Sequence, residues 1–218
     1  MKKYFNVLRK CPLFNGIENE NLTSMLACLN GHIVKYTKSS TIIEEGQYAN
    51  TIGIVLSGAV QLERTDYDGN RSIVTIVEPS GMFAEAFSCA ETPVPINVIA
   101  TSDCEIFFAD CKRIITTCSS SCEFHNKMIY NLLSIMATKN IMLNQKLEVI
   151  TKRSTREKLM TFLLQYSKKC SSTKFTIPYD RQQLADYLGV DRSGLSNEIS
   201  KLKSEGIIQA QKSMFEIL

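Results

Sequence analysis

Polar residues that can form hydrogen bonds recur at helical spacing near the C-terminal end of the sequence. They are Arg192, Ser193, Ser196, Asn197 and Lys201, opposite an apolar stripe of Leu195, Ile199 and Leu202 in a helix predicted for residues 192–205. In the major groove of DNA, arginine binds the O6 and N7 atoms of guanine, and asparagine binds N6 and N7 of adenine. Serine can contact a base or a phosphate, whereas Lys201 is expected to contact the backbone, which positions a protein without specifying sequence. The pattern predicts a helix that buries one face and reads DNA with the other.

A shorter helix is predicted just before this one and would hold it in place. It covers residues 181–188, where an apolar stripe faces inward and Arg181 and Gln182 are candidate contacts to DNA. Gly189 follows where a tight turn needs positive φ. Asp191 is a good N-cap for the second helix. Two short helices joined by a glycine turn are typical of a helix-turn-helix.

Two β-rich segments follow this helix pair. Residues 207–210 and 214–218 flank the short turn 211–213 and predict a hairpin, with Lys212 at its tip in reach of a phosphate. Without the hairpin, the two helices could also be an ordinary surface pair. The hairpin favours a winged helix-turn-helix, whose natural partner is double-stranded DNA.

Composition and charge agree with this interpretation. Of the 218 residues, 44% are hydrophobic and 22% charged, which is typical of a soluble globular protein. No apolar run approaches the length of a membrane helix, and the N-terminal residues lack the apolar segment of a secretory signal, so a cytoplasmic location without membrane attachment is expected. Residues 151–218 carry 12 Lys and Arg against 7 Asp and Glu, whereas residues 1–150 carry 13 against 15. The basic balance therefore lies at the predicted DNA-binding end.

Residues 31–109 have a different pattern. β-Branched runs predict strands over residues 32–36, 41–45, 51–58, 59–65, 71–77, 96–101 and 104–109. Turn residues separate them, among them Gly46, Gly58, the pair Asp68-Gly69, which is a strong hairpin signal, and Pro79 to Gly81. Short, regularly spaced strands predict an antiparallel barrel or sandwich.

Two stretches carry a family resemblance. The segment EEGxxxxxxxIVLSGAVxLxxxxxDGxxxIVTIVxPSGMFAE resembles the β-roll of the Crp/Fnr (cyclic-AMP receptor protein-like) family of bacterial regulators, and LADYLGVDRSGLSNEISKLKSEGII resembles that family's helix-turn-helix. The resemblance implies an α+β fold with an N-terminal cyclic-nucleotide-binding-type β-roll (a jelly roll), a long dimerisation helix and a C-terminal winged helix-turn-helix. It also implies a homodimeric transcription factor controlled by an effector, with RNA polymerase as a further candidate partner.

Residues 123–150 predict one long helix, because they contain neither Gly nor Pro. Apolar positions repeat every seven residues, as in a coiled-coil seam. The seam residues are Ile129, Leu133, Met136, Asn140, Leu143, Leu147 and Ile150. A helix packed only on its own domain is the alternative, but four heptads without a stop signal favour a dimer, and Asn140 would fix its register.

The predicted division has three parts. Residues 1–122 form the effector-sensing roll, residues 123–150 the dimerisation helix as part of the sensor, and residues 151–218 the winged helix-turn-helix. Residues 151–153 are a predicted hinge. Ser154 and Glu157 form a capping box for a helix over residues 155–167. A polar loop over 168–174 and a short strand over 175–178 complete the domain.

The effector is not identified by these residues. By resemblance, the candidate site comprises Phe83, Glu85 and Ile96 of the roll, with Lys139 and Asn140 of the long helix. Family members that bind cyclic AMP hold its phosphate with Arg and Ser or Thr where this sequence has Pro95 and Ile96. A phosphodiester needs a cation or N–H donors, and proline supplies neither, so no tight binding of cyclic AMP is expected. The cofactor or effector thus remains an unknown small molecule.

Other sensing chemistries have weaker support. An Fnr-type iron–sulfur cluster needs an N-terminal cysteine cluster, and only Cys11 lies there. Cys118, Cys122 and His125 have metal-ligand spacing, but the serines between the cysteines are expected to break a helix, and no metal site is predicted. Haem binding through His32 or His125 has no supporting motif. A thiol switch through Cys11, Cys111 or Cys118 would give a redox-controlled regulator of the same fold, and a constitutive DNA binder without effector is the further alternative.

An enzyme is not predicted. The sequence has no P-loop, nucleophile elbow, HExxH or paired-carboxylate motif, and its two histidines leave little for acid–base chemistry. A regulatory module that acts only on protein partners is disfavoured by the helix-turn-helix and its wing.

Overall fold

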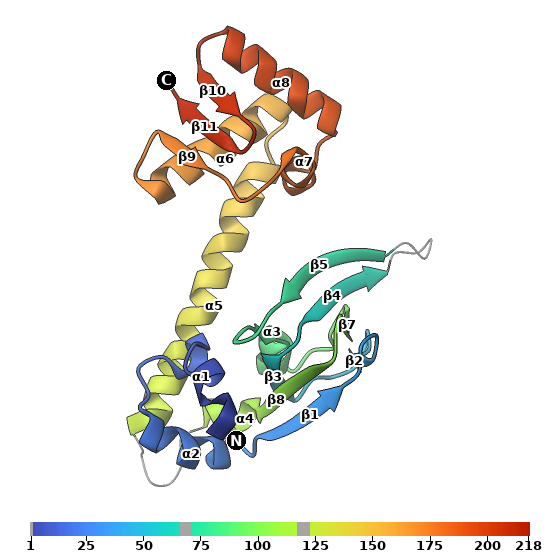
Figure 1. The fold of residues 1–218 in the computed structure, drawn as a ribbon, viewed down its shortest axis with the longest axis vertical. Coiled ribbons are helices and arrows are strands. Elements are labelled where there is room, and N and C mark those ends of the chain that lie inside the picture. The colour runs from blue at the N-terminus through green and yellow to red at the C-terminus, as the bar shows by residue number, and fades with distance from the viewer. Residues whose placement is uncertain (1, 66–70, 117–122) are drawn as a thin grey trace. The chain divides into compact units, whose positions relative to one another are not determined.

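The computed structural model describes residues 2–65, 71–116 and 123–218. The predicted Asp68-Gly69 turn, Cys118 and Cys122 lie outside these ranges. The chain forms two compact units, Met1–Ala137 and Thr138–Leu218, and the long helix α5 (Glu123–Ile150) runs from the first into the second (Figure 1). The predicted uninterrupted helix over residues 123–150 is confirmed.

The first unit is a two-sheet β-roll with helices before and after its strands and one short helix, α3, between β6 and β7. Its strands are β1 (His32–Tyr36), β2 (Thr41–Ile43), β3 (Thr51–Ser57), β4 (Val60–Thr65), β5 (Arg71–Val77), β6 (Met82–Phe83), β7 (Asn97–Ala100) and β8 (Cys104–Asp110). Its helical segments are η1 (Lys2–Tyr4), α1 (Phe5–Leu8), η2 (Pro12–Phe14), α2 (Asn19–Cys28), α3 (Glu85–Ala90) and α4 (Cys111–Ile115). The sheets have strand orders β1-β8-β3-β6 and β2-β7-β4-β5, and the described strands of both sheets pair antiparallel. The predicted antiparallel sandwich is therefore confirmed.

Strand β3 shows why this region reads as a continuous apolar run. Val55 packs among the residues inside the roll, whereas Ile52, Ile54 and Leu56 pack against α2, α4 and the first part of α5. Both faces of the strand are covered, so alternation of polar and apolar residues disappears. At its end Gly58 has φ +72°, and a Cβ there would lie 2.3 Å from the carbonyl oxygen of Asp103, so the turn requires glycine.

The second unit combines the end of α5 with a winged helix. Its elements are α6 (Thr155–Cys170), β9 (Lys174–Thr176), α7 (Arg181–Leu188), α8 (Arg192–Ser204), β10 (Ile208–Gln211) and β11 (Met214–Ile217). The three strands form one sheet in the order β10-β11-β9. One buried core joins Val149 of α5 to side chains of α6, α7, α8 and the sheet. The predicted hairpin of the wing is confirmed.

Two sequence-based limits in this unit are wrong. Helix α6 continues to Cys170 instead of ending at residue 167, and it stops where Ser171 adopts a left-handed conformation with φ +49°. The short strand covers Lys174–Thr176 instead of residues 175–178 because it pairs with Met214 to Glu216 of β11. Both ends of this strand are set by its pairing with β11, which the local sequence pattern cannot predict.

Candidate nucleic-acid interface

Helix α7 begins at a capping box. The Asp180 side chain accepts a hydrogen bond from the backbone N–H of Gln183 at 2.8 Å, and the Gln183 side chain accepts one from the N–H of Asp180 at 2.9 Å. Sequence inspection missed this cap, although Asp followed three residues later by Gln is a readable signal. The helix ends at Gly189 with φ +61°, as predicted from the need for a left-handed residue in the turn.

Helix α8 begins at Asp191, as predicted. Its carboxylate accepts from the N–H of Gly194 at 2.9 Å and from the Ser193 hydroxyl. The hydrogen bond from Ser193, followed by that from Gly194, holds the pKa of Asp191 below its ordinary value. The helix entry is therefore fixed as a charged cap at neutral pH.

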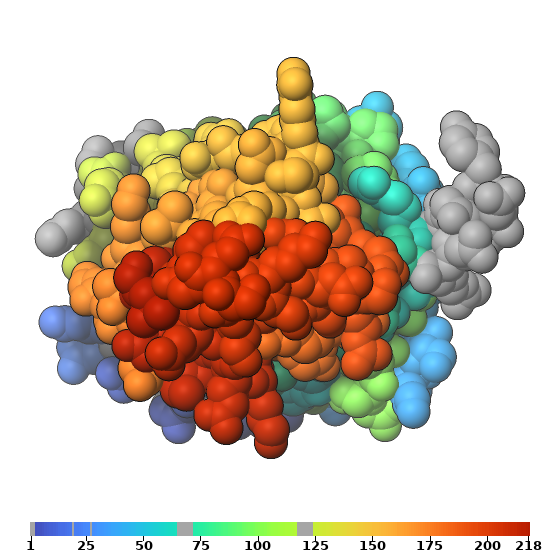
Figure 2. Space-filling view, turned by 90° about the horizontal axis from the view of Figure 1, so that it is seen from above, coloured from blue at the N-terminus to red at the C-terminus, as the bar shows by residue number. Residues whose placement is uncertain are grey.

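The two faces of α8 divide as the sequence predicted. Leu195, Ile199 and Leu202 are buried in the core of this unit. The side chains predicted to meet DNA are all exposed: Arg192, Ser193, Ser196, Asn197 and Lys201. In space-filling view, α8 and the wing strands, at the red end of the colour bar, lie together on one face of this unit (Figure 2).

The serines of this face already donate their protons within the protein. The Ser193 hydroxyl donates to Asp191, and the Ser196 hydroxyl donates to the carbonyl oxygen of Arg192 at 2.9 Å. Phosphate oxygens only accept hydrogen bonds. In this arrangement each hydroxyl offers lone pairs outward, which suits a base amino group better than a phosphate.

A hollow of about 530 Å³ lies between the two helix starts and the wing tip. It is lined by Asp180, Arg181, Gln182, Arg192, Lys212 and Ser213. The Ser213 hydroxyl donates to the carbonyl oxygen of Tyr179 at 2.9 Å, which ties the wing turn to the residue just before the cap of α7. Four of the side chains predicted to contact DNA are therefore brought to one concave site, and three of them are cationic.

The lining cations differ in how firmly they are held. The guanidinium of Arg181 is half-buried, lies over the ring of Phe215 at 4.9 Å, and has its pKa lowered by burial. Lys212 is exposed at the tip of the wing in a left-handed conformation with φ +50°. Gln182 donates to Asp186 at 2.8 Å on the surface of α7. The site thus combines Arg181, which is held against the Phe215 ring, with Lys212, which is exposed on the wing.

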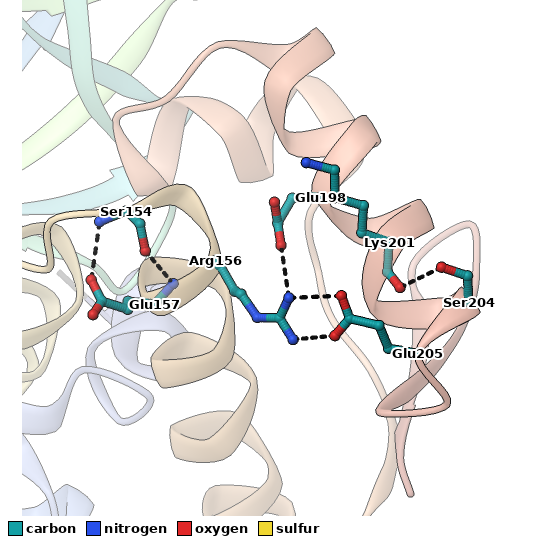
Figure 3. Close-up of polar contacts among 7 residues, drawn as sticks. All are labelled: Ser154, Arg156, Glu157, Glu198, Lys201, Ser204 and Glu205. Carbon is teal, nitrogen blue, oxygen red and sulfur yellow. Dashed lines mark hydrogen bonds and ion pairs between the residues drawn. The ribbon is translucent and has the colours of Figure 1, made fainter.

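Two acidic residues, Glu198 of α8 and the C-cap residue Glu205, are engaged with α6. Arg156 of α6 donates to both carboxylate oxygens of Glu205 through its terminal nitrogens Nη1 and Nη2, with Nη1 2.9 Å from Oε1. The same Nη1 lies 3.6 Å from Oε1 of Glu198 (Figure 3). The ion pair raises the pKa of Arg156 and lowers that of Glu205. Two carboxylates that would repel phosphates are therefore neutralised away from the exposed face. Sequence inspection missed Arg156, because a contact across 49 positions leaves no local signal.

The candidate effector residues lie in different surroundings. Phe83 and Ile96 are buried in the same apolar core of the roll, and the Phe83 ring stands edge-on to that of Phe108 at 6.3 Å. Glu85 is 4% exposed and opens α3, directly after Ala84 with φ +64°. Lys139 and Asn140 are exposed and belong to the other compact unit, where Asn140 accepts a hydrogen bond from the Asn144 side chain at 2.7 Å.

The predicted coiled-coil seam is mostly exposed in the single chain. The exposed fractions are 64% for Leu133, 63% for Leu143 and 51% for Leu147, and Asn140 and Ile150 are exposed as well. Ile129 and Met136 are only half-buried, and Met136 packs against the core of its own unit. The first half of α5 therefore uses a separate face, through Met128 and Leu132, to pack on the roll's helices.

The residues considered for thiol or metal chemistry have mixed environments. Cys11 is fully buried, and burial raises the pKa of its thiol to about 12. His125 is buried, with Nε2 2.6 Å from the carbonyl oxygen of Arg113, and His32 stacks on Phe108. Among the residues that the structure describes, no three His, Cys, Asp or Glu side chains are grouped as metal ligands. No described helix is both long and apolar enough to cross a bilayer.

Comparison with known domain families gives two matches along the chain. Residues 33–121 match the cyclic nucleotide-binding domain, and residues 157–218 match the Crp-like helix-turn-helix domain. The first match covers the roll, and the second covers the helices and wing that carry the basic hollow. Together they give the domain order that the sequence resemblance implied.

Full-length relatives agree with this order. The chain is 21% identical to the cyclic AMP receptor protein of Thermus thermophilus over 96% of its own length and 94% of the relative's. It is 23% identical to the transcriptional activator protein FnrL of Cereibacter sphaeroides over 79% of this chain and 71% of that one. The crystal structure of the Thermus thermophilus catabolite activator protein has the same fold, with a TM-score of 0.58 over 95% of this chain and 93% of that one at 20% identity. With both domains matched in order, the chain belongs to the Crp/Fnr family of transcriptional regulators and carries that family's helix-turn-helix DNA-binding domain.

Proposed function

We propose that this protein is a homodimeric, sequence-specific regulator that inserts α8 into the major groove of a palindromic operator. Arg192 contacts a guanine edge and Asn197 an adenine edge. Ser193 and Ser196 contact neighbouring bases. Arg181, Gln182, Lys201 and Lys212 contact the phosphate backbone and set the register of the protein.

The strongest support is the basic hollow beside the exposed face of α8. Arg181, Arg192 and Lys212 line it from three elements, and its volume of about 530 Å³ leaves room for a backbone phosphate. Arg156 supports the same role by pairing with the carboxylates of Glu198 and Glu205 on the far side of the helix. A cationic concavity beside a hydrogen-bonding helix face is the arrangement that DNA binding requires.

Binding should be measured by fluorescence anisotropy on a selected operator at a stated salt concentration. Arg192→Ala is expected to cost about 1–3 kcal/mol and to relax preference at one base pair. Lys168→Ala, which removes an exposed cation at the end of α6, is the control for net charge and should change affinity far less. Equal losses for the two variants would reduce the interface to non-specific attraction.

The exposed seam of α5 supports a two-fold symmetric dimer. Leu133, Leu143 and Leu147 present apolar side chains at heptad spacing, which a second copy would bury. Two helix-turn-helix units related by a two-fold axis bind half-sites about one helical turn, ~34 Å, apart. The operator is therefore a palindrome of that spacing.

Control by a small molecule in the roll completes the proposal. The ligand is not cyclic AMP, because neither residue at the phosphate-binding positions carries a charge. Pro95 also lacks a backbone N–H to donate to a phosphodiester, and the Ile96 side chain is apolar and buried. The relative from Thermus thermophilus, by contrast, is named a cyclic AMP receptor protein. The effector biases two orientations of the DNA-binding domains about residues 151–153, which requires a different affinity for the two states.

Isothermal titration calorimetry tests whether the protein binds cyclic AMP, and operator selection tests whether any effector is needed. Cyclic AMP is expected to give no micromolar binding, and a micromolar affinity would overturn the assignment of Pro95 and Ile96. If the apo-protein selects its operator without any ligand and no ligand changes that affinity, the constitutive alternative replaces effector control.

A further inference from the structure

Two cysteines of the first unit lie in direct contact. The Sγ atoms of Cys89, on α3, and Cys111, at the start of α4, are 3.0 Å apart. This separation is about 1 Å longer than a disulfide bond. We propose that Cys89 and Cys111 form a dithiol site that peroxide-class oxidants convert to an intramolecular disulfide. This site does not depend on the proposed function.

The backbone around both cysteines is held to the same stretch of chain. The Ser88 hydroxyl, next to Cys89, donates to the carbonyl oxygen of Thr51 at 2.8 Å. The backbone N–H of Cys111 donates to the carbonyl oxygen of Asn50 at 3.2 Å. Asn50 and Thr51 are consecutive residues at the start of β3. The segments that carry Cys89 and Cys111 are therefore hydrogen-bonded to the same short stretch of chain.

A second link joins the same helices at the surface. Lys112 Nζ lies 2.9 Å from Glu91 Oε1, so the residue after Cys111 is paired with the cap residue of α3. Asp110 caps α4 by accepting from the N–H groups of Lys112 and Arg113. The approach of the two sulfurs is therefore set by polar contacts on both sides, which reduces the movement needed to form a bond.

Their environments assign the two sulfurs different roles. Cys89 is half-buried and reaches solvent, whereas Cys111 is 1% exposed. Burial, followed by the contact with Cys89, raises the pKa of the Cys111 thiol to about 12. Cys89 therefore meets the oxidant first, and Cys111 is the resolving thiol.

The chemistry balances with one peroxide. The sulfur of Cys89 attacks hydrogen peroxide, the O–O bond breaks, and a sulfenic acid and one water form. The sulfur of Cys111 then displaces the sulfenic hydroxyl, forming the S–S bond, while the thiol proton leaves with that hydroxyl as a second water. The two sulfurs lose two electrons in total, and the peroxide gains them. Reduction by a dithiol reverses the modification.

Oxidation would cross-link the helix that carries Glu85 to the element that follows β8. Glu85 lies one helical turn before Cys89 on α3. If the proposed effector site includes Glu85, oxidation constrains that site; this consequence alone depends on the proposed function.

The test uses the full-length protein, reduced and then treated with hydrogen peroxide, after which all remaining free thiols are alkylated in denaturant. Cleavage after Glu and Lys places Cys89 in fragment 86–91, Cys104 in 92–105 and Cys111 in 106–112. The expected product links 86–91 to 106–112, lacks two hydrogen atoms, and disappears after reduction. Fragment 92–105 should be fully alkylated and serves as the internal control, because Cys104 is a buried cysteine of the same unit.

Two outcomes would overturn the proposal. One is alkylation of both Cys89 and Cys111 after oxidation, and the other is Cys111 linked to a different cysteine. Cys111→Ser adds a further readout, because Cys89 should then stop at the sulfenic acid and react with dimedone. If that variant does not fold, the mapping of the wild-type protein still decides the question.

Discussion

At the scale of single residues, Arg156 pairs with carboxylates beside α8 and leaves the exposed face that we propose to read DNA basic. Its guanidinium binds Glu205 through both terminal nitrogens and lies near Glu198, so the acidic side chains of α8 and of its C-cap are paired with α6. The exposed face keeps Arg192 and Lys201. One arginine on a neighbouring helix thereby separates the charges of α8 onto two sides.

This ion pair predicts a pH dependence. Arg156 holds the pKa of Glu205 below the ordinary value of 4.5, so the pair stabilises the folded unit above pH 4.5 and loses that effect as the pH falls through the lowered pKa. The Tm of the wild type should exceed that of Glu205→Gln at pH 7, and the difference should shrink below about pH 4.5. Thermal unfolding between pH 3 and 7 measures it. A difference that persists undiminished at pH 3 would exclude the ion pair as its source.

Asn197 and Lys201 predict two kinds of loss. Both side chains are exposed on α8, but an amide can discriminate bases whereas a lysine contacts phosphate. Asn197→Ala should change base preference, with a discrimination of about 1–3 kcal/mol at one position. Lys201→Ala should weaken all sequences alike and reduce the salt slope by about 1. Anisotropy on operator variants tests this, and equal losses on every variant for Asn197→Ala would contradict it.

At the scale of elements, two turn glycines predict different costs. Gly189 has φ +61° with no heavy atom within 4 Å of an added Cβ, so Gly189→Ala should cost only backbone strain, about 1–2 kcal/mol. At Gly58, φ is +72° and the added Cβ meets a backbone oxygen at 2.3 Å, so the free energy of unfolding should fall further. Urea unfolding of both variants compares them. A larger loss for Gly189→Ala would contradict the steric explanation.

Local patterns were sufficient for most elements. β-Branched runs predicted the main strands of the roll, the Asp191 cap predicted the start of α8, and the predicted end of α8 lies within one residue of the observed one. Helices α3 and α4 were not predicted, because they have only six and five residues and contact with β3 and β8 supports them. The end of α6 was predicted three residues too early, because Lys168, Lys169 and Cys170 are as compatible with a helix as with a polar loop.

The candidate site shows the same limit. The polar face of α8 follows from helical spacing, since periodicity decides which side chains are buried. The hollow that joins Arg181, Arg192 and Lys212 depends on tertiary packing of the wing turn against α7. The ion pairs of Arg156 and the contact between Cys89 and Cys111 also join residues that are distant in the sequence. A local sequence pattern cannot predict such contacts.

At the scale of the whole molecule, α5 is shared by the two units. The division lies between Ala137 and Thr138, within this helix, whereas the sequence suggested a limit at residues 150 and 151. The last turns of α5 join the core of the winged helix through Val149. Because Val149 packs in that core, the proposed reorientation about residues 151–153 requires this packing to change between the two states.

Dimer formation along α5 can be tested with two matched positions. Leu143 lies on the predicted seam and Ile141 does not, yet they are 63% and 58% exposed in the single chain. Leu143→Asp should dissociate the dimer, because a charge would be buried in the seam, whereas Ile141→Asp should not. Analytical ultracentrifugation over a range of concentrations measures both. Dissociation by Ile141→Asp alone would move the interface to another face of the helix.

The most direct test of DNA recognition is selection of bound sequences from a random pool by the purified apo-protein at stated salt. We expect a palindrome with half-sites about one helical turn, ~34 Å, apart. Arg192→Ala should lose preference at one pair of symmetric positions. If the protein enriches no sequence, alone or after a ligand screen, while it remains folded and dimeric, the proposed role of α8 in reading DNA is wrong.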